Sequence, residues 1–150
     1  MTIKQALKTL AESCSTNAFA LKSETKLGAC VLTEDGEIYE GCNIEANISG
    51  LGICAERLAI DHAILHGKYA YKALALYVNS EKTPIPCGAC LQYLMEFKPL
   101  AKKDITIYCF SKDKSKTYKL SKLLPKGYVG KRSIEKASKF ATSLTVGKRL

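Results

Sequence analysis

Cys54-Ala55-Glu56-Arg57 and Pro86-Cys87-Gly88-Ala89-Cys90 are the two stretches that decide how this chain folds, because each opens a predicted helix and together they supply three thiols and a carboxylate. Three cysteines at these spacings can hold a zinc ion, so Cys54, Cys87 and Cys90 are the candidate ligands. A tetrahedral zinc with three protein ligands keeps its fourth position open, which is typical of a catalytic rather than a structural site. We therefore predict one catalytic Zn²⁺ in each copy of the chain.

Helices and short strands alternate along the chain on both sides of these stretches. Apolar residues at helical spacing predict a helix over residues 2–14, and a mostly buried helix over residues 54–66 ends at Gly67. The Asp-Gly turn in Glu34-Asp35-Gly36-Glu37 predicts a hairpin. The other predicted elements are strands at 28–32, 38–41, 73–78, 105–110 and 116–120, a helix at 87–97 and a terminal helix at 133–141. This alternation predicts an α/β fold with three layers, α/β/α, around a central mixed five-stranded sheet. We expect the sheet to be antiparallel at the hairpin and parallel where helices cross over.

The length and composition suit one globular domain over residues 1–150, with residues 131–150 as a basic, helical C-terminal extension. No stretch approaches the roughly 20 apolar residues that span a bilayer, and the N-terminus lacks the features of a signal peptide. We therefore expect a cytoplasmic protein with no membrane partner. The net charge of +9 comes from dispersed lysines rather than a basic cluster interleaved with aromatic residues. This dispersal favours a solvated surface over a nucleic-acid partner.

The cysteines outside the two stretches invite a different interpretation from the candidate ligands. The chain has 7 cysteines, an odd number that cannot all pair. We interpret the remaining four as small apolar residues of the interior, because free cysteine is among the most buried residue types. They are Cys14, Cys30, Cys42 and Cys109.

Glu56 and Arg57 have separate predicted roles beside the metal. Glu56 stands two residues after Cys54, so its carboxylate can approach a water molecule at the open zinc position and act as a proton carrier. Three thiolates around one Zn²⁺ leave excess negative charge, which weakens the metal as a Lewis acid. Arg57 lies one helical turn after Cys54, and we expect its guanidinium to donate hydrogen bonds to the ligand sulfurs and offset that charge.

Both ligand groups lie at predicted helix starts, where free N–H groups and the helix dipole favour negative charge. We therefore expect the pKa of the ligand thiols to be lowered there.

The pairing of x-Glu with Pro-Cys-x-x-Cys is the arrangement of zinc-dependent nucleobase deaminases, and the chain as a whole resembles the cytidine deaminases that act on free nucleosides. The resemblance runs from about Gly28 to Tyr128. The segments that carry it are Gly41-Cys42-Asn43-Ile44-Glu45, Cys54-Ala55-Glu56-Arg57, Pro86-Cys87-Gly88-Ala89-Cys90, and Leu123-Leu124-Pro125 with Tyr128.

The resemblance implies roles for four substrate-binding residues. Asn43 and Glu45 would hold the hydroxyl groups of the sugar, and the backbone N–H of Ala55 would bind the pyrimidine carbonyl. The family's aromatic residue at the position of Tyr128 helps to complete the pocket of a neighbouring subunit. A homotetramer with pockets shared between subunits is therefore implied.

The chain departs from the family before its first strand. The family has Phe-x-Val-Gly-Ala there, whereas this chain has Thr25-Lys26-Leu27-Gly28-Ala29, so the aromatic residue of the pocket is missing. Blasticidin-S deaminases also lack it and have a Leu-Leu-Pro-x-Gly-Tyr-Val segment like residues 123–129. They do not keep the Glu of Asn-x-Glu, so Glu45 favours an ordinary nucleoside.

The implied activity is zinc-dependent hydrolytic deamination of cytidine and 2′-deoxycytidine to the uracil nucleosides in pyrimidine salvage, with release of ammonia. Three alternatives stay open at this point: a deaminase of a blasticidin-S-type antibiotic, a polynucleotide deaminase or nucleic-acid binder, and a zinc module without catalysis.

Overall fold

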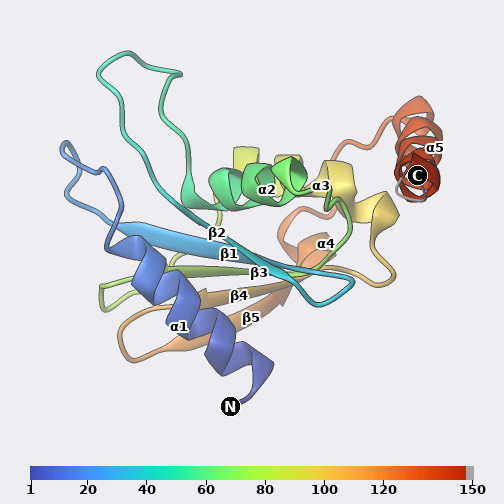
Figure 1. Ribbon diagram of the computed structural model, residues 1–150. Helices are drawn as coiled ribbons and strands as arrows, with labels where there is room; N and C mark the ends of the chain where they lie inside the picture. The colour runs from blue at the N-terminus through green and yellow to red at the C-terminus, as the bar shows by residue number, and fades with distance from the viewer. Residues whose placement is uncertain (148–150) are drawn as a thin grey trace.

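A computed structural model describes residues 1–147, and within its last helix it describes side chains at 131, 135–140, 142 and 143. One five-stranded sheet runs through the molecule in the order β2-β1-β3-β4-β5 (Figure 1). Its strands are β1 (Leu27–Thr33), β2 (Ile38–Cys42), β3 (Tyr71–Val78), β4 (Thr106–Phe110) and β5 (Ser115–Lys119). β3 and β4 pair in parallel, and the other neighbouring strands pair antiparallel, so the sheet is mixed as predicted.

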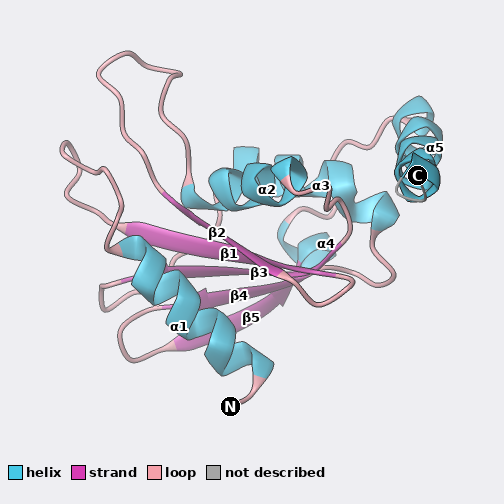
Figure 2. Cartoon of the chain, in the orientation of Figure 1, coloured by secondary structure: helices cyan, strands magenta, loops and turns pink. Residues whose placement is uncertain are grey.

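Helices cover both faces of this sheet (Figure 2). α1 (Ile3–Ser15) packs on one face, where Leu7 and Ala11 join a core cluster with β1, β3 and β4. α2 (Ala55–Leu65) and α3 (Gly88–Phe97) lie side by side on the other face, over the larger core cluster. The three-layer α/β/α prediction is therefore confirmed. No helix in the described part of the chain is long and apolar enough to cross a membrane.

The structure has two short helices that the sequence pattern did not predict, and its terminal helix is longer than predicted. A short 3₁₀ helix, η1 (Lys98–Leu100), and a one-turn helix, α4 (Leu120–Leu123), flank β4 and β5. α5 (Lys131–Gly147) is longer than the helix predicted at 133–141, and it stands away from the sheet beside η1. Tyr69 meets Phe140 of α5 edge-to-face at 5.2 Å between ring centroids.

The two helices that carry the cysteine motifs are tied to each other and lie close to the sheet. The hydroxyl of Tyr93 in α3 donates to Asp61 Oδ1 in α2 at 2.6 Å. Gly41 of β2 lies against α2 so closely that an added Cβ would be 2.4 Å from the backbone nitrogen of Ala59. The close approach fixes the first turns of α2 against β2, and the bond from Tyr93 to Asp61 ties α2 to α3. The candidate ligands lie at the starts of these two helices.

Candidate metal centre and pocket

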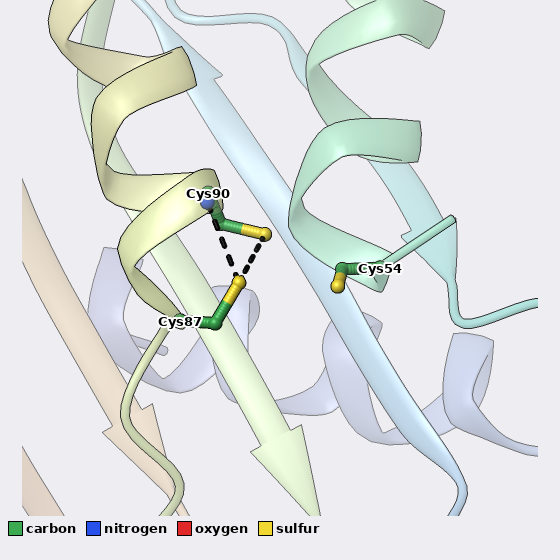
Figure 3. A group of neighbouring side chains, drawn as sticks. All are labelled: Cys54, Cys87 and Cys90. Atoms are coloured by element: carbon green, nitrogen blue, oxygen red, sulfur yellow. Dashed lines mark hydrogen bonds between the residues drawn. The ribbon is translucent and has the colours of Figure 1, made fainter. Parts of the chain in front are cut away.

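The three candidate ligands converge at the N-terminal ends of α2 and α3 (Figure 3). Cys54 is the N-cap of α2 and Cys87 is the N-cap of α3, while Cys90 lies in the first turn of α3. Their sulfur atoms all lie within 4.8 Å of one another, and the Cys87 and Cys90 sulfurs are 3.4 Å apart. Tetrahedral zinc with Zn–S bonds of about 2.3 Å separates its sulfur ligands by roughly 3.8 Å. The donor set and its spacing therefore fit one Zn²⁺.

The pKa values of the three thiols differ, which corrects the expectation from helix starts alone. At Cys87 the backbone N–H of Cys90 donates to the sulfur at 3.5 Å. Burial opposes the charged form there, but hydrogen bonds from backbone N–H groups and from the Cys90 and Cys54 side chains outweigh it, and the pKa of Cys87 is lowered. The Cys54 side chain accepts no capping bond, and burial raises the pKa of Cys54. Burial also raises the pKa of Cys90, which lies nearer the interior. Deprotonating Cys54 and Cys90 therefore depends on the metal, and zinc binding releases protons.

Arg57 lies against the thiols of Cys54 and Cys90. Burial opposes its charge, but hydrogen bonds and charge interactions with the sulfurs of Cys54 and Cys90 raise the pKa of Arg57 overall. Its Nε atom is buried without a partner in the described chain. The guanidinium thus supplies fixed positive charge beside the thiols.

Glu56 is a buried carboxylic acid on the first turn of α2. Its side chain is 4% exposed, and burial raises the pKa of Glu56, although interactions with Cys90 and Arg57 pull the other way. A carboxyl group with a raised pKa keeps its proton to a higher pH than an exposed one, which suits a group that accepts a proton and passes it on.

A cavity of about 500 Å³ opens above these groups. Its lining includes Cys54, Ala55, Glu56, Arg57 and Cys87 on the helix side. The opposite walls come from the loop before β1 and from the long loop between β2 and α2, which stands clear of the helices in Figure 1. The cavity is large enough for a nucleoside-sized ligand.

Asn43 and Glu45 line the same cavity and are already anchored by backbone groups. Asn43 Nδ2 donates to the carbonyl of Thr25 at 2.9 Å, and its Oδ1 accepts from Leu27 N–H at 2.8 Å. Glu45 accepts the N–H of Lys22 at 2.7 Å and that of Ser23. A hydrogen bond with the Ser23 side chain, followed by these backbone bonds, holds the pKa of Glu45 below its usual range. Each side chain keeps further hydrogen-bonding capacity, so both can still bind a ligand hydroxyl.

Two predicted pocket positions lie outside this cavity. Tyr128 is 74% exposed and does not line it. Its backbone N–H and carbonyl are both bonded to the Gln92 side chain, at 2.9 and 2.7 Å, which fixes the segment on α3. Thr25 instead lines a neighbouring hollow and reaches the site only through its carbonyl on Asn43.

The structure also adds pocket residues that the sequence reasoning missed. They come from loops without a recognisable motif and from the lining of the sheet: Lys22, Ser23, Leu27, Leu76, Ile85 and residues in the 46–53 region. No local pattern indicates them, because they meet the site only through tertiary folding.

Comparison with known proteins agrees with this geometry. The family model described as "Cytidine and deoxycytidylate deaminase zinc-binding region" matches residues 1–107. The chain belongs to this family. A cytidine deaminase of Sporosarcina psychrophila is 42% identical over 92 residues, which cover 60% of this chain and 68% of that protein.

Solved members of the family share the fold. The crystal structure of a cytidine deaminase from Burkholderia pseudomallei superposes with a TM-score of 0.77 at 30% identity, covering 85% of this chain and all of that chain.

A blasticidin-S deaminase of Bacillus cereus is also similar in sequence. It is 28% identical over 81 residues, covering 49% of this chain and 58% of that protein. Family membership and the thiol geometry together identify the metal of this site as zinc.

Proposed function

We propose that this protein is a zinc-dependent hydrolase that deaminates cytidine and 2′-deoxycytidine, converting each with one water molecule to the uracil nucleoside and ammonia. The observation that carries the proposal is a group of three thiols, two of which line a cavity together with the buried Glu56, and the presence of Asn43 and Glu45 on the far side of that cavity. Membership of the cytidine deaminase family supports the same reaction.

Each group at the cavity has a proposed role that follows from its position. Cys54, Cys87 and Cys90 would hold the zinc ion, which would supply Lewis acidity that activates water. Glu56 would accept a proton as water attacks the amino-bearing carbon, pass it to the ring nitrogen and assist the departing amine. Arg57 offsets the charge of the thiolates. Ala55 is the first residue of α2, so its N–H has no partner within the helix and can bind the pyrimidine carbonyl.

Asn43 and Glu45 are proposed to bind the sugar. Both face the cavity while the backbone of the loop before β1 fixes their orientation. A fixed amide and a fixed carboxylate lose little freedom on binding and can together bind adjacent hydroxyl groups.

Turnover by the zinc-loaded protein and its Glu56→Gln variant tests this function. We expect ammonia release and the accompanying ultraviolet change with cytidine, and a loss of about 10²–10⁴-fold in kcat for Glu56→Gln with zinc retained. Glu81→Gln, at an exposed carboxylate away from the cavity, is the matched control. No turnover of any cytosine nucleoside by the zinc-loaded wild type would refute the function, and full activity in Glu56→Gln would refute the role of Glu56.

Blasticidin S is a second candidate substrate, favoured by the position of Thr25 outside the cavity and by the similarity to a blasticidin-S deaminase. Glu45 at the cavity favours the nucleoside. A substrate panel of cytidine, 2′-deoxycytidine, blasticidin S and single-stranded DNA separates these activities and also tests the polynucleotide alternative.

We further propose a homotetramer in the cytoplasm, acting in pyrimidine salvage as a single domain with residues 131–150 as an extension. The exposed Tyr128, held against α3 away from its own cavity, supports a role in the pocket of a neighbouring subunit. Three thiol ligands favour a reducing compartment. The molar mass of the purified protein by light scattering tests the assembly, and a monomeric mass would refute it.

A further inference from the structure

The 2 histidines of the chain, His62 and His66, lie one turn apart at the end of α2. Residues four apart on a helix share one face, and the two imidazole rings accordingly meet, with 5.0 Å between their centroids. Neither histidine lines the cavity that holds Glu56 and Asn43. The pair is therefore a cluster of metal-ligating side chains that is separate from the proposed deaminase site.

Backbone carbonyl groups determine which nitrogen of each ring is free to bind a metal ion. His62 Nδ1 lies 3.0 Å from the carbonyl oxygen of Glu40 in β2, and His66 Nδ1 lies 2.9 Å from the carbonyl oxygen of His62. A carbonyl oxygen can only accept a hydrogen bond, so Nδ1 carries the proton in both rings. In a neutral imidazole, the other nitrogen, Nε2, then keeps a free lone pair. Metal-binding histidines typically donate their second ring N–H in this way.

Tyr39 holds both rings from the side of the sheet. Its ring centroid is 5.3 Å from that of His62 and 5.0 Å from that of His66, and Tyr39 is itself buried. Metal–nitrogen bonds of about 2.0–2.1 Å place two imidazole nitrogens on one ion roughly 3 Å apart. Rings at the observed separation can present their Nε2 atoms at that spacing. His66 is exposed, so solvent can reach an ion bound there.

We propose that His62 and His66 form a second metal site, which binds a divalent transition-metal ion through Nε2 of both rings. Imidazole ligands suit Zn²⁺, Ni²⁺ and Cu²⁺, whereas Mg²⁺ and Ca²⁺ prefer oxygen ligands. This site goes beyond the proposed deaminase function and does not rest on it, because the two sites share no residue.

The chain offers single-ligand variants and a matched control for this proposal. His62→Gln and His66→Gln each replace one imidazole with a polar side chain. Leu65→Gln introduces the same side chain at a neighbouring position that is 84% exposed and supplies no metal ligand. The probe is Ni²⁺, added to zinc-loaded protein so that the three thiols are already occupied.

Calorimetry measures the number and affinity of bound Ni²⁺ ions, and nuclear magnetic resonance identifies the ligands. We expect one Ni²⁺ per chain in the wild type and in Leu65→Gln. We expect either histidine variant to weaken this binding at least about tenfold, because the loss of a ligand should cost no less than the loss of a group that orients one. Paramagnetic Ni²⁺ should broaden the imidazole C–H signals of both histidines together.

Wild-type binding of Ni²⁺ no stronger than that of the double variant His62→Gln/His66→Gln would overturn the proposal. Wild-type affinity in either single variant would also overturn it, because one ring would then suffice. The same holds for an equal loss in Leu65→Gln, which would reflect a change in the helix, and for broadening of one histidine alone. Failure of the wild type to deaminate cytidine would refute the proposed function and leave this test unaffected.

Discussion

Replacing Gly41 with alanine should damage the metal site from the opposite side of α2. Gly41 lies in β2, and a Cβ added there would be 2.4 Å from the nitrogen of Ala59 and 2.5 Å from the carbonyl oxygen of Ala55. Both atoms belong to the backbone of α2, so no side-chain rotation can relieve the overlap. Ordinary contact begins at 3.4 Å, and α2 must therefore withdraw by about 1 Å.

A shift of this size acts on the site more than on the fold. Overpacking of this kind costs about 1–3 kcal/mol, out of a free energy of unfolding of roughly 5–15 kcal/mol for a typical domain. Most of the protein would stay folded. Cys54 and Glu56 move with α2, however, while Cys87 and Cys90 stay on α3. Because a 1 Å misplacement of reacting groups can cost about 100-fold in rate, we expect that loss in kcat together with weaker zinc binding.

Gly28→Ala is the control, because it creates the same kind of overlap on the other face of the sheet. Its Cβ would be 1.9 Å from the carbonyl oxygen of Ala11, in α1, which carries none of the candidate site residues. Urea unfolding gives the stability of each variant, and zinc content and cytidine turnover are compared per mole of folded protein. Normal zinc content and turnover in folded Gly41→Ala would refute this reasoning, and so would an equal loss in Gly28→Ala.

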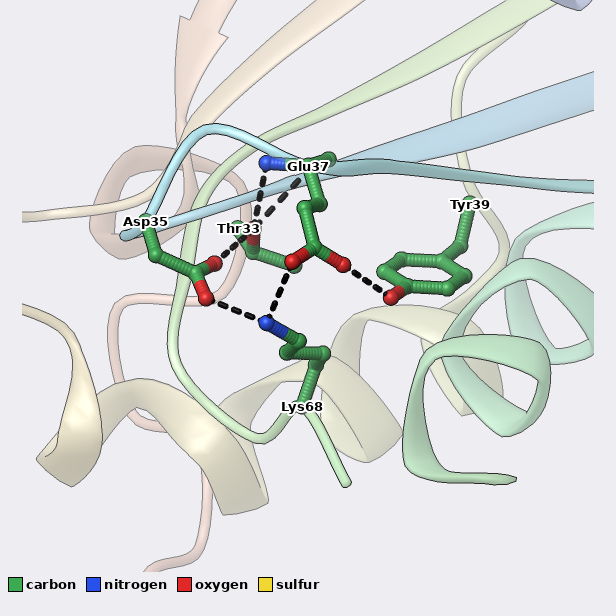
Figure 4. Close-up of polar contacts among 5 residues, drawn as sticks. All are labelled: Thr33, Asp35, Glu37, Tyr39 and Lys68. Atoms are coloured by element: carbon green, nitrogen blue, oxygen red, sulfur yellow. Dashed lines mark hydrogen bonds and ion pairs between the residues drawn. The ribbon is translucent and has the colours of Figure 1, made fainter. Parts of the chain in front are cut away.

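Two further predictions concern the metal and the hairpin between β1 and β2. Removing zinc with a chelator should abolish turnover and lower the midpoint of thermal unfolding, because zinc binds the folded state preferentially. Adding Zn²⁺ back should restore both the turnover and the midpoint. An unchanged midpoint would contradict a bound metal. At the hairpin, Lys68 binds Asp35 and Glu37 (Figure 4), and its hydrogen bond is the main cause that lowers the pKa of Asp35 to about 2. Since the Asp35 side chain is 54% exposed, Lys68→Met should cost only about 1 kcal/mol near neutral pH. A lowered carboxyl pKa stabilises the fold above the ordinary value of 3.8, so the difference between wild type and Lys68→Met should shrink as pH falls from 4 to 2. Urea unfolding across this range measures it, and a constant difference would contradict the assignment.

The sequence predicted those features that depend on neighbouring residues. Apolar runs located the strands, and Gly67, which adopts φ +71°, ended the helix that became α2. The two cysteine motifs were correctly placed at helix starts. Strand order depends on contacts far apart in sequence, so the position of β1 between β2 and β3 could not be derived from the pattern. The one-turn helix α4 is too short for its apolar residues to show a helical periodicity.

The thiol pKa values show where a local rule is insufficient. Both Cys54 and Cys87 cap a helix, and the dipole argument treats them alike. Only Cys87 receives a backbone N–H, whereas burial dominates at Cys54 and raises its pKa. Burial and side-chain rotamer are tertiary properties, so the difference between these two thiols required the structure.

The same distinction separates the chemistry of this site from its substrate preference. The candidate metal ligands, Glu56 and Arg57 lie within two short segments, so the sequence alone indicates these candidates. The walls of the cavity depend on contacts between residues far apart in sequence, such as the bond from Lys22 to the carbonyl of Ala46, and on backbone carbonyls and N–H groups that every residue possesses. Replacing the family's aromatic residue with Thr25 therefore changes less of the site than the sequence suggests, because that position contributes its carbonyl to Asn43 rather than its side chain to the cavity.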